Sequence, residues 1–175
     1  FDGSNMELNE NIDMTCKAVE LAKSYGASVE AELGVVGYEK GIKSEFTDPE
    51  LAQEFYAATQ VDALAISVGN THLEQEKATE VNTKLLSQIE KFVNCPLVIH
   101  GGSGIKSPQL YWLAKNTAIC KINIGTELRQ VFGEKLREYL LNNPTIFDRI
   151  EILSRVYENV IPATKKIILN LRPDK

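Results

Sequence analysis

His72 and His100 are the only histidines in this chain of 175 residues, and each follows an apolar run. Imidazole is a common zinc ligand, and an open catalytic zinc site takes three protein ligands. A lone histidine at the end of a strand more often makes only hydrogen bonds. The spacing therefore leaves two interpretations equally open, a shared metal site and two ordinary polar residues, and a metal site would need a third ligand.

A glycine-rich run, Gly101-Gly102-Ser103-Gly104, continues from His100 and is followed by a predicted helix. Such a loop can point backbone N–H groups at a phosphate, with the Ser103 hydroxyl as a further donor. A flexible turn is the alternative interpretation of the same run. Asn123-Ile124-Gly125-Thr126 follows the next apolar run and could form a second wall of a phosphate pocket.

The segments that must position these residues alternate between apolar runs and amphipathic runs. The apolar runs predict strands at 28–33, 61–68, 96–99 and 118–124. Helical spacing, with the helix-start pattern Asp48-Pro49-Glu50, predicts helices over about 12–25, 47–60, 83–92, 108–116 and 128–140. Two more helical patterns lie in 146–171, split at Pro162, and loops are predicted at 35–43 and 73–82.

Four alternations of strand and helix predict a parallel sheet with right-handed crossovers. An open doubly wound sheet and part of a barrel both fit this alternation. Every strand turns polar or glycine-rich at its carboxyl end, and in a barrel these ends meet at the active-site face. We therefore expect an α/β fold of the (β/α)8 TIM-barrel type. The chain supplies roughly its last four βα units and the C-terminal helices, as a single domain over 1–175.

Composition restricts the partners. The net charge of −5 argues against nucleic acid or an anionic membrane as the main partner. No apolar run approaches the roughly 18 residues that span a bilayer, and no signal segment opens the chain. Cys16, Cys95 and Cys120 are widely spaced, as in a reducing compartment, so we expect a cytoplasmic protein. Phe1-Asp2-Gly3-Ser4 is typical of a strand end, so we expect a longer protein.

Four runs together resemble the class II, zinc-dependent fructose- and tagatose-bisphosphate aldolases, in the family's order and over nearly the whole chain. They are Phe1-Asp2-Gly3-Ser4, Val29-Glu30-Ala31-Glu32-Leu33-Gly34, the run 97–104 and the run 121–129. The resemblance implies that His72 and His100 are two of three zinc histidines, with Glu32 as an alternative metal ligand.

The same resemblance implies how substrate binds. Gly101, Gly102 and Ser103 would form one loop around the phosphate of the dihydroxyacetone-phosphate half. Asn123, Ile124, Gly125 and Thr126 would form the other, with Asn123 also near the reacting carbons. A monovalent cation near these loops and a homodimer or homotetramer are common in the family.

The implied reaction is cleavage or formation of a ketose 1,6-bisphosphate, with dihydroxyacetone phosphate and an aldehyde as the halves. Zinc acts as a Lewis acid that polarises the ketone and stabilises the enediolate, so no Schiff-base lysine is needed. In the family an Asp-His pair supplies the proton-transfer carboxylate and the third zinc histidine, and nothing in this sequence matches that pair.

Three positions depart from the family's pattern. Leu73 stands where the family usually has glycine, and Gly125 stands where fructose-type members often carry Asp and tagatose-type members a small residue. A single Glu39 followed by Lys40 replaces paired acids, so no catalytic role is expected for Glu39. These departures leave the substrate open. Two alternatives also remain, another phosphosugar-processing TIM-barrel reaction and a diverged paralogue without catalysis.

Overall fold

The computed structural model describes residues 1–37, 44–73 and 79–171. The strands are β1 (Glu30–Leu33), β2 (Ala63–Ile66), β3 (Leu97–Ile99) and β4 (Ile119–Ile122). The helices are α1 (Leu8–Ser24), α2 (Pro49–Thr59), α3 (Thr83–Phe92), α4 (Ser107–Asn116), α5 (Thr126–Asn142) and α6 (Arg149–Leu171), with a 3-10 turn η1 (Gly102–Gly104). The predicted alternation of strands and helices is therefore confirmed.

Local sequence explains where two of the helices begin. The Asp48 carboxylate accepts hydrogen bonds from the backbone N–H groups of Glu50 and Leu51 at 2.8 and 3.1 Å, and Pro49 occupies the first turn of α2. The Asn82 side chain accepts from Leu85 N at 3.0 Å at the start of α3. These caps satisfy N–H groups that have no partner within their own helix.

The four strands are parallel and lie in the order β1-β2-β3-β4. Asp2 forms a parallel bridge with Glu32, so the first residues of the chain lie beside β1, as the strand-end prediction for Phe1-Asp2 requires. One aligned row crosses the whole sheet: Glu32 pairs with Ala65, Ala65 with Val98, and Val98 with Lys121.

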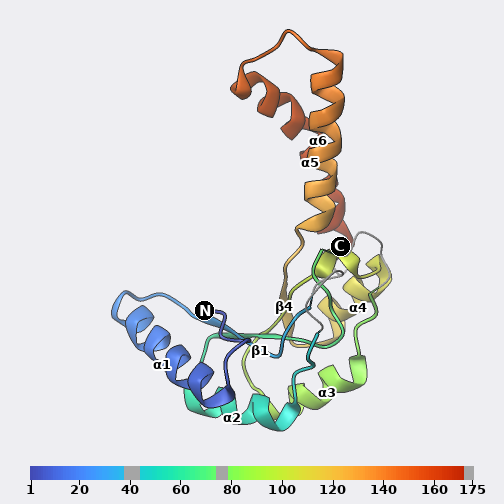
Figure 1. The fold of residues 1–175 in the computed structure, drawn as a ribbon. Coiled ribbons are helices and arrows are strands. Elements are labelled where there is room, and N and C mark those ends of the chain that lie inside the picture. Colours follow the sequence, from blue (N-terminus) through green and yellow to red (C-terminus); the bar gives the residue numbers. More distant parts are fainter. Residues whose placement is uncertain (38–43, 74–78, 172–175) are drawn as a thin grey trace.

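The two faces of the sheet differ. On the outer face, strand residues such as Leu64, Ile66, Leu97 and Ile99 form one buried cluster with residues of α1, α2, α3 and α4. These four helices follow one another in an arc around the strands (Figure 1). A doubly wound sheet would carry helices on both faces, so the arrangement matches part of a (β/α)8 barrel.

The inner face carries the aligned row of Glu32, Ala65, Val98 and Lys121. Ala65 and Val98 are fully buried but lie outside the cluster that packs against the helices. Small and medium-sized side chains at the centre of this face leave room above them for longer side chains from the edge strands.

The C-terminal helices depart from the sequence prediction. α5 and α6 pack against each other and project away from the sheet (Figure 1), and no residue of α5 is buried. The predicted split at Pro162 is wrong, because α6 continues through this residue. A proline inside a helix costs about 3 kcal/mol. α6 packs against α5 and α4 on both sides of Pro162, with the contacts Tyr139–Glu151 and Ser107–Asn170.

No helix in the described part of the chain is both long enough and apolar enough to cross a membrane.

Candidate active site

The site residues expected from the sequence lie at one edge of the sheet, because parallel strands bring their carboxyl ends together. Glu32 lies within β1, while His72, His100 and Asn123 follow β2, β3 and β4. Asn123 N donates to Ile99 O at 2.8 Å, and Gly102 N donates to Asn123 O at 3.0 Å. These two bonds join the segment after β3 to the segment after β4.

Four side chains form a connected chain of polar contacts on the inner face: Glu30, Glu32, His100 and Lys121. Lys121 Nζ lies 2.6 Å from Glu30 Oε2, and Glu30 Oε1 lies 3.4 Å from His100 Nε2. The other ring nitrogen, His100 Nδ1, lies 3.2 Å from Glu32 Oε2. We call these four residues the inner-face network. It places the His100 ring between two carboxylates.

The network separates the proton affinities of the two histidines. Hydrogen bonding to the Glu32 carboxylate raises the pKa of His100 above its usual value, and this outweighs the opposite effect of burial. Burial lowers the pKa of His72, and the nearby His100 lowers it further. Burial alone would raise the pKa of Glu30, but hydrogen bonds from Lys121 and His100 bring it below its usual value.

The spacing of the donors fits part of a metal site. The ring centroids of His72 and His100 are 5.8 Å apart. Two imidazoles that share one zinc ion, each bound at 2.0–2.1 Å, have centroids roughly 5–6 Å apart. Two donor atoms of one tetrahedral zinc ion lie about 3.3 Å apart, and His100 Nδ1 and Glu32 Oε2 are separated by 3.2 Å. Within residues 1–37, 44–73 and 79–171, however, no group of three such side chains could hold a metal ion.

The turn after β3 brings Gly101 against the segment that carries His72. Gly101 has φ +67, and a Cβ atom built on it would lie 2.2 Å from Thr71 O. A Cβ atom on Gly102 would lie 2.4 Å from Ile122 Cγ2. Both positions therefore need glycine for close approach, and Gly101 also needs it for its backbone conformation. Gly101 precedes the 3-10 turn η1, so this turn lies between the Thr71 backbone and the Ile122 side chain.

The Asn70 side chain forms a hydrogen bond with the backbone just before this turn. Its side chain is fully buried; Nδ2 donates to His100 O at 3.0 Å and Oδ1 accepts from Val68 N at 2.8 Å. His72 N in turn donates to Gly37 O at 2.7 Å. The backbones of both histidine segments are thus fixed by hydrogen bonds.

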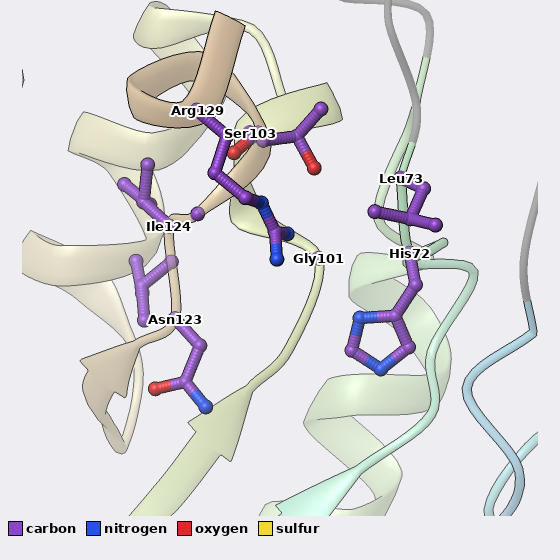
Figure 2. A pocket seen from close by; sticks show the side chains of 10 residues that line it. His72, Leu73, Gly101, Ser103, Asn123, Ile124 and Arg129 are labelled. Atoms are coloured by element: carbon purple, nitrogen blue, oxygen red, sulfur yellow. The ribbon is translucent and has the colours of Figure 1, made fainter. Parts of the chain in front are cut away.

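A cavity of about 600 Å³ lies between the segment that carries His72, the glycine turn after His100 and the start of α5. In Figure 2, His72 and Leu73 lie on one side, and Asn123, Ile124 and Arg129 lie on the other. Its walls comprise His72, Leu73, Gly101, Ser103, Ile122, Asn123, Ile124, Gly125, Thr126 and Arg129. Seven expected site residues are therefore together here: His72, Gly101, Ser103, Asn123, Ile124, Gly125 and Thr126. Gly102, Glu32 and His100 lie beside it and do not line it.

The Ser103 hydroxyl has a defined position at this cavity. It is mostly buried and accepts a hydrogen bond from Glu127 N, in the first turn of α5, at 3.2 Å. The amino end of a helix carries partial positive charge, which favours anions. The Arg129 guanidinium extends from α5 into the space facing His72 and Leu73 (Figure 2). The cavity is therefore suited to a phosphate group.

Leu73 has φ +57, a left-handed conformation that favours glycine. This conformation explains physically why a glycine is expected at this position, and Leu73 adopts it although it carries a Cβ atom. Its side chain lines the cavity and is 46% exposed. Other parts of the two predicted loops, including Glu39 and Lys40, lie outside the described residues.

Glu30, Asn70, Lys121 and Arg129 were not predicted as site residues, although the structure places each of them at the site. One sequence pattern could have indicated Glu30: Glu30 and Glu32 alternate in a strand and so share a face. The contact of Lys121 with Glu30 depends on how the sheet curves, which no local pattern predicts. Glu30, Lys121 and Arg129 stand in runs quoted for the family resemblance, and Asn70 lies two residues before His72, but their contacts at the site form only in the folded chain.

Comparison with known proteins agrees with this geometry. The family description "Fructose-bisphosphate aldolase class-II" matches residues 1–173. The YdjI aldolase from Escherichia coli K12 has a similar structure, with a TM-score of 0.74 and 30% identity over 98% of this chain and 58% of that chain.

Two further solved structures support the fold alone, since their identities are lower. A putative fructose-1,6-biphosphate aldolase from Coccidioides immitis has a TM-score of 0.82 and 22% identity, covering 97% of this chain and 61% of that chain. The fructose-bisphosphate aldolase from Campylobacter jejuni has a TM-score of 0.73 and 24% identity, covering 97% and 58%. The chain thus spans 58% to 61% of these three solved chains.

The carboxyl ends of the parallel strands carry two facing histidines, a glycine turn and a cavity at a helix start. The family match covers residues 1–173, which include all of these features. The fold is part of the barrel fold of these aldolases. The chain therefore belongs to the class-II fructose-bisphosphate aldolase family.

Proposed function

We propose that this protein is a metal-dependent aldolase that cleaves or forms a ketose 1,6-bisphosphate of the fructose or tagatose type. The observation that carries the proposal is the position of His72 and His100, with ring centroids 5.8 Å apart, beside a cavity suited to phosphate. Family membership supplies the reaction class. The products of cleavage would be dihydroxyacetone phosphate and an aldehyde.

The phosphate of the dihydroxyacetone-phosphate half would lie between the two strand-end loops. Gly101, Gly102 and Ser103 would supply one side, and Asn123, Ile124, Gly125 and Thr126 the other. Close glycine packing supports this role, because a loop without side chains lets backbone N–H groups approach an anion. Asn123 would direct its amide toward the reacting carbons, and a monovalent cation would bind near these loops.

The metal would be zinc, held by His72 and His100, with Glu32 as an alternative ligand. The spacing of the histidine rings and of His100 Nδ1 from Glu32 Oε2 supports this. When bound, zinc would supply Lewis acidity for the substrate ketone. The histidines hold their positions through backbone bonds to Gly37 and Asn70. The proposal requires a third donor and a proton-transfer group in addition to these residues.

We also propose that residues 1–175 act as one domain within a homodimer or homotetramer in the cytoplasm. The net charge of −5 argues against nucleic acid or an anionic membrane as the main partner, whereas a small phosphorylated substrate would bind in a local pocket.

The test is aldol cleavage of fructose and tagatose 1,6-bisphosphates by the full-length protein, before and after chelation and after zinc is restored. We expect chelation to abolish cleavage and zinc to restore it. Cleavage that is indifferent to chelation, or a borohydride-reducible imine with substrate, would contradict the metal mechanism. Interconversion of sugars without cleavage would indicate another phosphosugar reaction. A His100→Ala variant that keeps full biological activity would indicate a paralogue without catalysis.

A further inference from the structure

Glu30 and Lys121 lie behind the proposed metal ligands and have no role in the function proposed above. We propose that they are positioning residues: Glu30 accepts a hydrogen bond from His100 Nε2–H, which leaves Nδ1 as the metal-binding nitrogen, and Lys121 holds Glu30 in this role. The inference rests on the metal-dependent function proposed above. It concerns which nitrogen of His100 binds the metal and what orients the ring.

The contacts divide the two oxygens of Glu30 between two partners. Oε2 lies 2.6 Å from Lys121 Nζ, and Oε1 lies 3.4 Å from His100 Nε2. The opposite ring nitrogen, Nδ1, lies 3.2 Å from Glu32 Oε2, on the side of the alternative ligand. Because neutral imidazole has one donor and one acceptor nitrogen, a proton on Nε2 leaves the lone pair of Nδ1 for a metal. A carboxylate at the far nitrogen also makes the ligand nitrogen more basic.

Lys121 prevents a competing role for Glu30. A carboxylate this close to a metal-binding histidine could itself turn toward the ion. The ammonium group of Lys121 attracts the Glu30 carboxylate away from the metal position. Lys121 belongs to β4, which lies at the opposite edge of the sheet from β1. Ala65 and Val98 lie between these strands in the aligned row, and their short side chains let Glu30 and Lys121 meet above them.

Stability alone does not explain this pair. The Lys121 side chain is 49% exposed, and exposed ion pairs contribute only about 0–1 kcal/mol to stability. The His100 side chain, by contrast, is 15% exposed, so its orientation depends on its protein neighbours. The effect of the pair should therefore appear in metal binding more than in unfolding.

The test uses the zinc form of the full-length protein and its Glu30→Gln, Lys121→Met and Lys121→Arg variants. In the wild type, Lys121 and His100 contact different oxygens of Glu30, and glutamine replaces one of these oxygens by an NH2 group that only donates, so one of the two contacts is lost in this geometry. Zinc affinity is measured by competition with a chromophoric chelator. Imidazole ¹⁵N chemical shifts of the wild-type zinc form identify the nitrogen that carries the metal.

We expect zinc on Nδ1 and a proton on Nε2 in the wild type. Glu30→Gln should weaken zinc binding about 10- to 100-fold, the usual range for such supporting residues. Lys121→Met should also weaken zinc binding, whereas Lys121→Arg, which keeps the positive charge, should bind zinc as the wild type does. Lys135 and Glu138 form a matched control, since their ion pair has the same 2.6 Å separation but lies on α5. Lys135→Met should leave zinc affinity unchanged.

Zinc on Nε2 in the wild type would overturn the inference, whatever the variants do. So would a folded Glu30→Gln variant with zinc affinity within about twofold of the wild type, given the expected range. In both cases the proposed metal-dependent function would stand. Failure of the wild-type protein to bind zinc at all would overturn that function and this inference together. The ¹⁵N measurement needs no variant, so the test does not depend on how well a variant folds.

Discussion

Lys121 Nζ lies 2.6 Å from Glu30 Oε2, although these residues belong to the two edge strands of a four-stranded sheet. In a flat sheet, β1 and β4 would be about 14 Å apart, since neighbouring strands are spaced by about 4.8 Å. The contact therefore shows that the sheet curves toward its inner face. This curvature brings the strand-end residues toward a common centre, as a barrel active site requires.

The inner-face network predicts the order in which the two histidines take up protons. In the metal-free protein, His100 should titrate above the usual value of 6.5 and His72 below it. A raised pKa in the folded state stabilises the protein below the unfolded pKa, and this contribution is lost as the pH rises through the folded pKa of His100. Imidazole signals followed by NMR over about five pH units, from about pH 4 to about pH 9, give the pKa values of both histidines.

Removing the Glu32 carboxylate should change the pKa of His100. Glu32→Gln should lower the pKa of His100, because the hydrogen bond to Glu32 is the largest influence that raises it. Glu20→Gln changes a carboxylate on the exposed side of α1 and should leave both titrations in place. Equal values for the two histidines, or the reverse order, would contradict the geometry of the network.

Asn70 should be a major source of local stability. Asn70→Ala leaves the buried Val68 N and the partly buried His100 O without their side-chain partner. Each buried polar group that loses its partner costs about 1–3 kcal/mol, so we expect a loss of about 2–4 kcal/mol in the free energy of unfolding. Equilibrium urea unfolding measures this loss.

Asn94→Ala is the matched control, because Asn94 is exposed in the loop between α3 and β3. It should change the free energy of unfolding by less than about 0.5 kcal/mol. A similar small change for Asn70→Ala would mean that the turn after β3 does not depend on this side chain.

Much of the fold was predictable, because the information is local. Apolar runs and helix caps such as Asp48 identify the elements, and parallel strands then bring His72, His100 and Asn123 to one edge. All four strands begin one or two residues later than predicted, and only β2 and β4 also end two residues earlier than predicted. Pro162 was misjudged because contacts of α6 with α5 and α4, which are distant in sequence, outweigh the local preference.

Which candidate residues lie together at one edge of the sheet was predictable, and the contacts between them were less so. Residue types and runs indicated His100 and the Gly101 turn. They could not indicate that Lys121 reaches Glu30 across two strands, or that Ser103 accepts from the first turn of α5. Those contacts follow from sheet curvature and from how α5 leaves β4, and neither is written in a local pattern.

At position 73, a glycine variant should be more stable than an alanine variant, which reverses their usual order. Its φ of +57 strains any residue with a Cβ atom by about 1–2 kcal/mol. Both Leu73→Gly and Leu73→Ala remove most of the apolar side chain, but only glycine also relieves this strain. We therefore expect the Gly variant to be more stable than the Ala variant by about 1 kcal/mol in urea unfolding.

Leu21 offers the opposite case, as an exposed leucine with helical backbone in the last turn of α1. There the Ala variant should be more stable than the Gly variant by about 1 kcal/mol, as helix propensity dictates. If Ala were also the more stable variant at position 73, the left-handed backbone at Leu73 would be wrong.

Gly101 and Gly26 separate backbone conformation from close approach. Their φ values are +67 and +66, but a Cβ atom on Gly26 would have no atom within 4 Å, whereas on Gly101 it would lie 2.2 Å from Thr71 O. Gly26→Ala should therefore cost only the conformational strain, about 1–2 kcal/mol. Gly101→Ala must also displace the Thr71 backbone, so its cost in unfolding free energy should be about 1–3 kcal/mol larger.

Displacement at Gly101 should also reach the cavity, because Thr71 precedes His72 and Gly101 lines the same space. In the full-length protein, Gly101→Ala should weaken binding of dihydroxyacetone phosphate at least about tenfold, the equivalent of one lost charge-assisted hydrogen bond. Gly26→Ala, in the turn that follows α1, should leave binding unchanged. Calorimetric titration measures both. Equal affinities for the two variants would mean that the turn after β3 does not shape the proposed phosphate site, even if the stability difference is observed.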